Sequence, residues 1–486
     1  MKKNTLISLV LMAVSSVVAA DSSGTNKLKD AIIQIVTGPI TGGQHGMAFN
    51  PVPAGILEQH GYSQQEYFIA GIATAYAFKE RTGAEGKWSV TPTTSATYKT
   101  RMLVRRPVDS AKFNGTVVVE WLNVSAGQDS DPDWGFSHEE IMRSGGVWVG
   151  VSAQSAGVGN GAGMKLQFPG FNPQPLKKWD PERYDSLQHP GDQYSYDIFT
   201  QAGRALVRST SVNPLGDLNP KIIIAIGESQ SAGRMLTYVN AIHPVARVYD
   251  GFLIHSRGSS GASLNGDASG TVPKVSFIRD DLDAPVMQIE TETDMFGLGF
   301  YPARQPDTKK LVTWEMAGTA HADQSAIDYG NQSYLVWSAI PSAMAQMRGI
   351  NDGPQRYIVR SALSALNIWC RGGSAPVHGE PFTITNGAAI ARDTNGNAEG
   401  GVRTPQIDVP TETLSGAAAQ TMNMFSVMFG SATPFPPEKL AELYPNHQDY
   451  AAKVMAAART SVAAGYLLPA DQTEIVSHAQ NAKIPN

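Results

Sequence analysis

A serine at residue 229 lies in the most constrained local pattern of this chain. Residues 222–226 are a continuous apolar run (Ile-Ile-Ile-Ala-Ile), and residues 227–231 follow with Gly-Glu-Ser-Gln-Ser. The run is typical of a buried parallel strand, and residues 232–239 read as a helix. A turn this short between strand and helix lifts the serine hydroxyl off the end of the sheet and aims the helix N-terminus at the same point. The pattern predicts Ser229 as a nucleophile and the backbone N–H of Gln230 as a donor to an oxyanion.

The turn departs from the usual G-x-S-x-G pattern at one position. Its last residue is Ser231 where glycine is usual. A small residue is needed there so that the helix can approach the strand closely, and serine meets this requirement.

Strand-like segments recur along the chain at a spacing that indicates an α/β layout. Residues 194–207 carry apolar side chains on one helical face. Strands that alternate with helices predict a mostly parallel central sheet of about eight strands with flanking helices. We expect strands at residues 31–36, 98–105, 116–122, 147–151, 221–226, 251–254, 285–289 and 311–314.

The N-terminus has the three parts of a cleavable signal peptide. Residues 2–3 are lysines, residues 6–18 are apolar, and residues 18–20 (Val-Ala-Ala) offer small side chains before Asp21. The apolar run is too short to span a bilayer comfortably. We expect residues 1–20 to be removed and the mature protein to be periplasmic or secreted.

Two further segments exceed what a minimal α/β unit needs. Residues 157–193 are rich in Gly, Pro, Asn and Asp and predict a long ordered excursion. Residues 373–486 predict a C-terminal cap, with loops and short strands at 382–410 and helices at 437–482. No low-complexity linker precedes the cap, so we expect it to pack on a core formed by residues 21–372.

A serine nucleophile needs a base beside it and an acid that orients the base. His321 follows the strand at 311–314 through a short Gly-containing loop, which makes it the preferred base. Asp294 follows the strand at 285–289 and is the preferred acid, with Glu292 as the alternative. Glu290, in the same loop, is equally compatible with a solvated position.

The remaining site candidates are less constrained. The second oxyanion donor should come from the loop after residues 116–122, where Asn123 and Val124 are the candidates. Four other residues are possible pocket-lining positions: His45, Tyr194, His255 and Arg403.

Composition and motifs give no indication of a metal, cofactor or macromolecular partner. The formal net charge is −5, and the basic residues do not cluster, which argues against nucleic acid and anionic membranes. Residues 129–133 (Asp-Ser-Asp-Pro-Asp) resemble the start of a calcium loop, but Trp134 replaces the required glycine, so a capping role at the next helix is simpler. No zinc spacing, P-loop or dinucleotide fingerprint occurs in context. Oligomeric state is left open.

Together these stretches resemble the α/β-hydrolase superfamily, and more narrowly the large, mostly exported bacterial "alpha/beta hydrolase domain" proteins. The similarity covers nearly the whole mature chain and implies an α/β-hydrolase fold with a triad at Ser229, Asp294 and His321. It implies little about substrate. The stretches that carry it are residues 38–43, 120–125, 189–197, 227–231, 292–294, 317–323 and 400–405.

The leading hypothesis is an exported serine hydrolase that cleaves a small carboxylic ester through an acyl-enzyme. One alternative keeps the triad but cleaves an amide or peptide bond, or transfers the acyl group to an acceptor other than water. Another is a catalytically silent hydrolase fold used for binding.

Overall fold

The computed structural model of the chain describes residues 34–159, 172–207, 212–265, 271–333, 349–418 and 426–484. The predicted signal peptide at residues 1–20 lies outside these ranges, as do residues 160–171 of the predicted excursion. Among the described helices, none is both long enough and apolar enough to cross a membrane.

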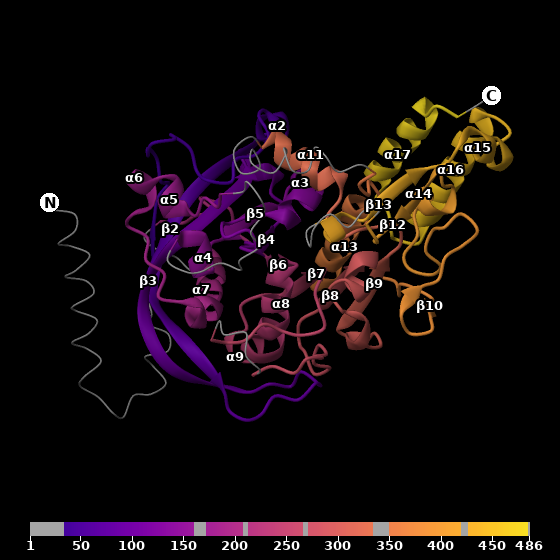
Figure 1. Cartoon of the computed structure of the whole chain (residues 1–486). Coiled ribbons are helices and arrows are strands. Elements are labelled where there is room, and N and C mark those ends of the chain that lie inside the picture. Colours follow the sequence, from indigo (N-terminus) through magenta and orange to yellow (C-terminus); the bar gives the residue numbers. More distant parts are fainter. Residues whose placement is uncertain are drawn as a thin grey trace, which may run out of the picture.

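Nine strands form the main sheet, in the spatial order β1-β2-β3-β5-β4-β6-β7-β8-β9 (Figure 1). Strands β4 to β9 pair in parallel, whereas β1, β2, β3 and β5 are joined by antiparallel pairs. This arrangement confirms the predicted α/β-hydrolase fold, with one strand more than the sequence indicated. The strands are β1 (Ile35–Thr37), β2 (Tyr62–Phe78), β3 (Val90–Pro107), β4 (Thr116–Trp121), β5 (Val147–Val151), β6 (Ile222–Glu228), β7 (Gly251–His255), β8 (Val286–Thr291) and β9 (Leu311–Met316).

The additional strand is β2, a 17-residue segment that pairs along its length with β3. Its sequence begins with polar residues and continues with alternating alanines, so it lacks a clear period-two apolar pattern. Glu66 in this strand is buried because Arg183 pairs with it at 2.6 Å. Tertiary pairing therefore makes a strand of a segment whose side chains do not indicate one.

Helices cover both faces of the sheet, and α8 begins directly after the serine turn (Figure 1). Three 3₁₀ segments and one π-helical segment complete the elements around the sheet: η2 (Ser110–Lys112), η3 (Asp192–Tyr194), η5 (Tyr301–Ala303) and η4 (Tyr238–Ile242). The helices of this part are α2 (Ile56–Gln59), α3 (Pro132–Ser144), α4 (Ser155–Val158), α5 (Leu176–Trp179), α6 (Pro181–Tyr184), α7 (Ser195–Val207), α8 (Gln230–Thr237), α9 (His243–Ala246), α10 (Glu292–Phe296), α11 (Gln324–Gln332) and α13 (Gln355–Cys370).

Side-chain alternation along the central strands divides the core into two layers. In β4, Val117 and Val119 join the apolar cluster that includes α7 and α8, whereas Val118 joins the cluster with α3 and α13. All six residues of β4 are buried. A strand covered on both faces reads as a continuous apolar run, which is why residues 116–122 were recognisable in the sequence.

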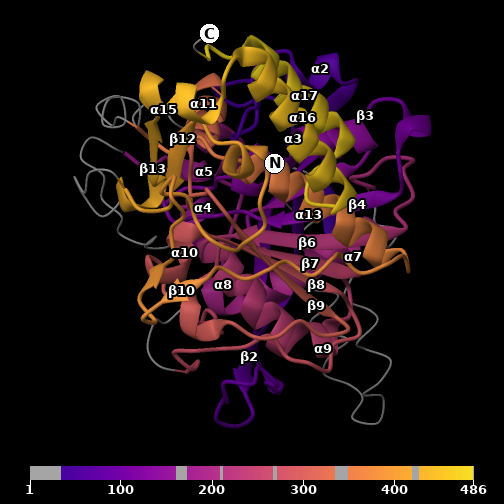
Figure 2. The same cartoon turned by 90° about the vertical axis from the view of Figure 1, so that its right-hand side faces the viewer.

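The C-terminal segment packs against the hydrolase core. Val402 bridges Met316 at the end of β9, and α17 lies beside α3 and α13, where Arg143 and Arg360 both pair with Asp471 (Figure 2). The division at residues 372/373 stays a prediction. The elements are β10 (Ile384–Thr385), β11 (Ala389–Ile390), α14 (Pro405–Asp408), β12 (Glu412–Ser415), η6 (Ser426–Phe429), β13 (Ser431–Pro434), α15 (Pro437–Leu443), α16 (His447–Ala463) and α17 (Pro469–Asn481).

Candidate active site

Ser229 occupies a strained turn between the end of β6 and the start of α8. Its backbone has φ 59° and ψ −117°, a conformation that residues with side chains rarely adopt. The N–H of Ser229 donates to the carbonyl of His255 on β7 at 2.9 Å. A Cβ on Gly227 would lie 3.0 Å from the carbonyl oxygen of Ser231, so this close strand-to-helix approach requires glycine there. Ser231 is fully buried, in agreement with the expected need for a small residue.

The three residues predicted as a triad lie in one hydrogen-bonded line. The Nε2 atom of His321 lies 2.8 Å from Ser229 Oγ, and its Nδ1 atom lies 2.7 Å from Asp294 Oδ1. They come from the ends of β6, β8 and β9, which meet at one edge because those strands are parallel. Ser229 is half-buried, and His321 is 7% exposed.

Local hydrogen bonds orient the acid and the base. The second carboxylate oxygen of Asp294 accepts bonds from the backbone N–H and the hydroxyl of Thr291, each at 2.7 Å. The backbone N–H of His321 donates to the hydroxyl of Thr293 at 3.2 Å. Thr291, at the N-cap of α10, therefore holds the carboxylate of Asp294, and Thr293, in the first turn of α10, holds the backbone of His321. Neither threonine was singled out in the sequence.

The charges of Asp294 and His321 stabilise each other. Burial alone would raise the pKa of Asp294, but His321 and the Thr291 hydrogen bonds hold it below its usual value. Burial acts to lower the pKa of His321, yet the carboxylates of Glu228 and Asp294 outweigh it and raise that pKa to about 9. The imidazolium form of His321 is thus strongly favoured by its surroundings.

Glu228 is a site residue that the sequence prediction missed. Its Oε1 lies 3.2 Å from the Nε2 of His321, on the same ring nitrogen that faces Ser229. Burial raises the pKa of Glu228 to about 7, although the charge of His321 acts to lower it. The available signal was an acid directly before the nucleophile, at the end of an apolar strand.

The other two acids of this loop, Glu292 and Glu290, have different surroundings. Glu292 accepts from the backbone N–H of Gly318 at 2.7 Å and pairs with Arg392 at 2.7 Å. Glu290 is fully buried rather than solvated, and burial raises its pKa well above the usual range. The geometry therefore favours Asp294 over Glu292 as the partner of His321.

The oxyanion candidates are separated by their hydrogen bonds. Gln230 is the first residue of α8, so its backbone N–H has no acceptor within that helix. The backbone N–H of Asn123 donates to the carbonyl of Ser130 at 2.9 Å, and its side-chain amide donates to the backbone carbonyl of Glu228 at 3.1 Å. With the Asn123 groups occupied, Val124 is the stronger candidate for the second donor.

The four possible pocket-lining residues have contacts of their own. His45 is exposed and stacks on Trp179 with ring centroids 4.2 Å apart. The Tyr194 hydroxyl pairs with Thr94 at 3.0 Å.

His255 is fully buried and lies 2.9 Å from Asp133. Arg403 donates to Asp408 at 2.7 Å and to the carbonyl of Ala398. These side-chain contacts are to residues other than Ser229, Asp294 and His321, and it is the backbone carbonyl of His255 that accepts from the N–H of Ser229.

The acidic stretch at residues 129–133 does not cap the next helix through its own side chains. Asp129 pairs with buried Arg101 at 2.8 Å, and Asp131, at the N-cap of α3, pairs with Arg105 at 2.6 Å instead of capping. The carboxylate of Glu120 accepts from the backbone N–H groups of residues 133 and 134 at 3.1 and 2.9 Å. The predicted capping role is therefore wrong in its acceptor: the carboxylate of Glu120 on β4 caps α3, because the arginines of β3 pair with Asp129 and Asp131.

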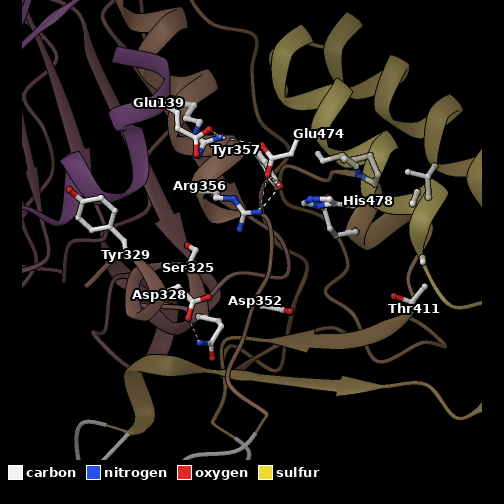
Figure 3. Close-up of a pocket in the computed structure, with 18 of the residues that line it drawn as sticks. Glu139, Ser325, Asp328, Tyr329, Asp352, Arg356, Tyr357, Thr411, Glu474 and His478 are labelled. Carbon is white, nitrogen blue, oxygen red and sulfur yellow. Dashed lines mark hydrogen bonds and ion pairs between the residues drawn. The ribbon is translucent and has the colours of Figure 1, made fainter. Parts of the chain in front are cut away.

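A cavity of about 640 Å³ lies elsewhere, between the core and the C-terminal helices (Figure 3). Arg356 points across it toward Glu474, 3.3 Å away. Glu139, Asp471 and Glu474 are close enough to share a cation, but Arg360 already contacts the first two at 2.9 and 3.1 Å.

Ser325 also lines this cavity, and its hydroxyl donates to Asp323 at 2.6 Å. Because the described lining of this cavity shows no hydrogen-bonded Ser–His pair, the Ser229 site is the stronger candidate for nucleophilic chemistry.

Comparison with known proteins gives one extended match. A family model described as "Alpha/beta hydrolase domain" matches residues 36–477. No curated protein sequence matches the chain.

Solved structures give only remote similarities. An α/β serine hydrolase without a lid from Xanthomonas campestris has 10% identity and a TM-score of 0.29, over 56% of this chain and 94% of that one. A cold-adapted esterase from an Arctic intertidal metagenomic library has 11% identity and a TM-score of 0.25, over 52% and 84%. A glucuronoyl esterase from Solibacter usitatus has 10% identity and a TM-score of 0.26, over 63% and 86%. Similarities at these scores carry no argument about substrate.

Proposed function

Since this chain belongs to the alpha/beta hydrolase domain family, we propose that it is a serine hydrolase that cleaves a carboxylic ester of a small molecule. The observation that carries the proposal is the unbroken contact line from Ser229 Oγ through His321 to Asp294, with distances of 2.8 and 2.7 Å. A nucleophile, a base within hydrogen-bond reach and an acid that orients the base are the parts that acyl transfer requires.

In the acylation step, Ser229 Oγ attacks the ester carbonyl as its proton moves to Nε2 of His321. The Nδ1–H of His321 donates to Asp294, which holds the tautomer that leaves Nε2 free to accept. When the tetrahedral intermediate collapses, the bond to the leaving alcohol breaks and that oxygen takes the proton from Nε2. The acyl group is then bonded to Oγ.

In the deacylation step, water takes the place of the leaving alcohol. His321 accepts one water proton at Nε2 while the water oxygen attacks the acyl carbon. Collapse then breaks the bond between the acyl carbon and Oγ, transfers the proton from Nε2 to Oγ and releases the carboxylic acid. The developing oxyanion would be held by the backbone N–H groups of Gln230 and Val124. Both donors would be backbone groups that are fixed before the substrate binds.

Fluorophosphonate labelling of the mature protein tests this proposal. We expect one labelled peptide, carrying the adduct on Ser229, together with turnover of short-chain p-nitrophenyl esters. Ser325→Ala is the matched control, because Ser325 lines the cavity away from His321 and should leave labelling unchanged. A folded wild-type protein that neither labels nor turns over esters would favour the binding-protein alternative. Faster cleavage of a matched amide than of its ester would favour an amidase.

We also propose that the protein is exported to the periplasm or the medium. The basic pair at residues 2–3, the apolar run at 6–18 and the small residues at 18–20 support this. Expression of the full chain in a Gram-negative host should yield a protein that begins at Asp21, as read by intact mass. An unprocessed protein confined to the cytoplasm would refute export without affecting the hydrolase proposal.

A further inference from the structure

The ring nitrogen of His321 that faces the nucleophile also faces a second carboxylate. Glu228 Oε1 is 3.2 Å from Nε2, and Ser229 Oγ is 2.8 Å from the same atom. Glu228 is 6% exposed and is the last residue of β6. His321 is therefore held between two acids, one at each ring nitrogen.

The Glu228 carboxylate is held in place rather than free to turn away. The amide of Asn123, just after β4, lies 3.3 Å from Oε2 and 3.1 Å from the backbone carbonyl of Glu228. On the β7 and α3 side it faces His255 and Asp133, whose side chains lie 2.9 Å apart. From α10 the facing group is Asp294. His321 is thus the partner that its Oε1 contacts.

We propose that Glu228 is a positioning residue that acts through His321, holding the ring and favouring its imidazolium form. This inference rests on the proposed function, because His321 matters only if it is the base. A neutral imidazole with Nδ1–H on Asp294 presents a lone pair at Nε2, which an ionised carboxylate 3.2 Å away opposes. The imidazolium presents N–H there, which the carboxylate attracts. Imidazolium forms as the serine attacks, so Glu228 stabilises the transition state more than the ground state.

The same contact sets the pH at which the base is available. The pKa of His321 is raised to about 9 by Glu228 and Asp294 against the opposing effect of burial. Neutral base appears only as the pH rises through this pKa. The wild-type enzyme should therefore gain activity at alkaline pH, and loss of the Glu228 charge should move that gain to lower pH.

The isosteric variant Glu228→Gln tests the proposal. Its amide oxygen can still accept from Asn123, while its NH₂ group can face Nε2. We expect the midpoint of the acid limb of kcat/KM to fall by about one unit or more. At pH values above that limb, we expect the kcat/KM of Glu228→Gln to be about tenfold below that of the wild type for each unit by which the pKa of His321 falls. Glu228→Asp should recover part of both effects.

A measurement that needs no substrate keeps the inference separable from the proposed function. In protein labelled with ¹³C at histidine Cε1, NMR titration gives the pKa of His321, assigned by its absence from His321→Gln. We expect Glu228→Gln to lower that pKa by about one unit or more. An unchanged titration would overturn the role of Glu228 whether or not esters are cleaved, whereas a lowered pKa in a protein without ester turnover would refute only the hydrolase.

Glu290→Gln is the matched control for removal of a buried acid. Glu290 lies on β8, is fully buried and makes no recorded contact with His321. Burial raises its pKa well above the usual range, as burial also raises that of Glu228. We expect this variant to leave the acid limb in place, and an equal shift in both variants would show a general effect of altered burial instead of a specific contact.

Discussion

Ser229→Ala should lower kcat/KM on a short-chain p-nitrophenyl ester by about 10⁴-fold or more. The substitution removes the atom that attacks the carbonyl, and with it the 2.8 Å contact to Nε2 of His321. Residual rate above water would come from the oxyanion donors and from substrate binding. The comparison requires steady-state kinetics of both proteins, with thermal melting to show that the variant is folded.

The neighbouring structure makes a folded variant the expected outcome. Ser229 donates through its backbone to His255, a bond that alanine keeps. The strained φ of 59° is no worse for alanine than for serine. A folded Ser229→Ala protein with wild-type kcat/KM would rule out Ser229 as the nucleophile, and Ser325→Ala, in the other cavity, would then be the next variant to measure.

Asp294→Asn should reduce kcat by up to about 10⁴-fold, the second largest effect expected. An amide at this position can donate to Nδ1 of His321, which would put the proton on Nε2 and remove the site's capacity to accept from Ser229. The 2.7 Å contact and the depressed pKa of Asp294 are both properties of a carboxylate that stays ionised beside the histidine. The measurement is kcat at a fixed alkaline pH.

Glu292→Gln separates the two acids considered from the sequence. Glu292 accepts from Gly318 and pairs with Arg392, away from the histidine ring, so its loss should affect stability more than kcat. Leaving a buried donor without its acceptor costs about 1–3 kcal/mol of unfolding free energy, and water can solvate Arg392 because its side chain is exposed. If Glu292→Gln lost as much kcat as Asp294→Asn while melting normally, the choice of Asp294 would be wrong.

Much of the fold could be predicted because its strands carry their pattern locally. The segments at β4, β5, β6 and β7 are predominantly apolar and fully or almost fully buried, since both faces of the sheet are covered by helices. Strand β2 could not be predicted in the same way. Its pairing with β3 and the burial of Glu66 depend on partners such as Arg183, which is far away in the sequence.

The candidate site shows the same difference between features that depend on local pattern and features that depend on distant contacts. Ser229, Asp294 and His321 were predictable because each follows an apolar strand, and ends of parallel strands meet at one edge of a sheet. The engagement of Glu292 by Arg392, and of Asn123 by Glu228 and Ser130, depends on contacts between distant segments. Periodicity and turn signals carry no information about such contacts.

Hydrophobic period and tight-turn chemistry are local properties, and they were enough to predict the fold class, the strand–turn–helix that presents Ser229, and the chain order of Ser229, Asp294 and His321. Which carboxylates reach His321 depends instead on contacts between distant segments. Charge and hydrogen-bond partners are set by distances of about 3 Å, to which sequence spacing is insensitive. Glu228 is adjacent to Ser229 in the chain, but its 3.2 Å contact with His321 exists because β9 brings the histidine back to the end of β6.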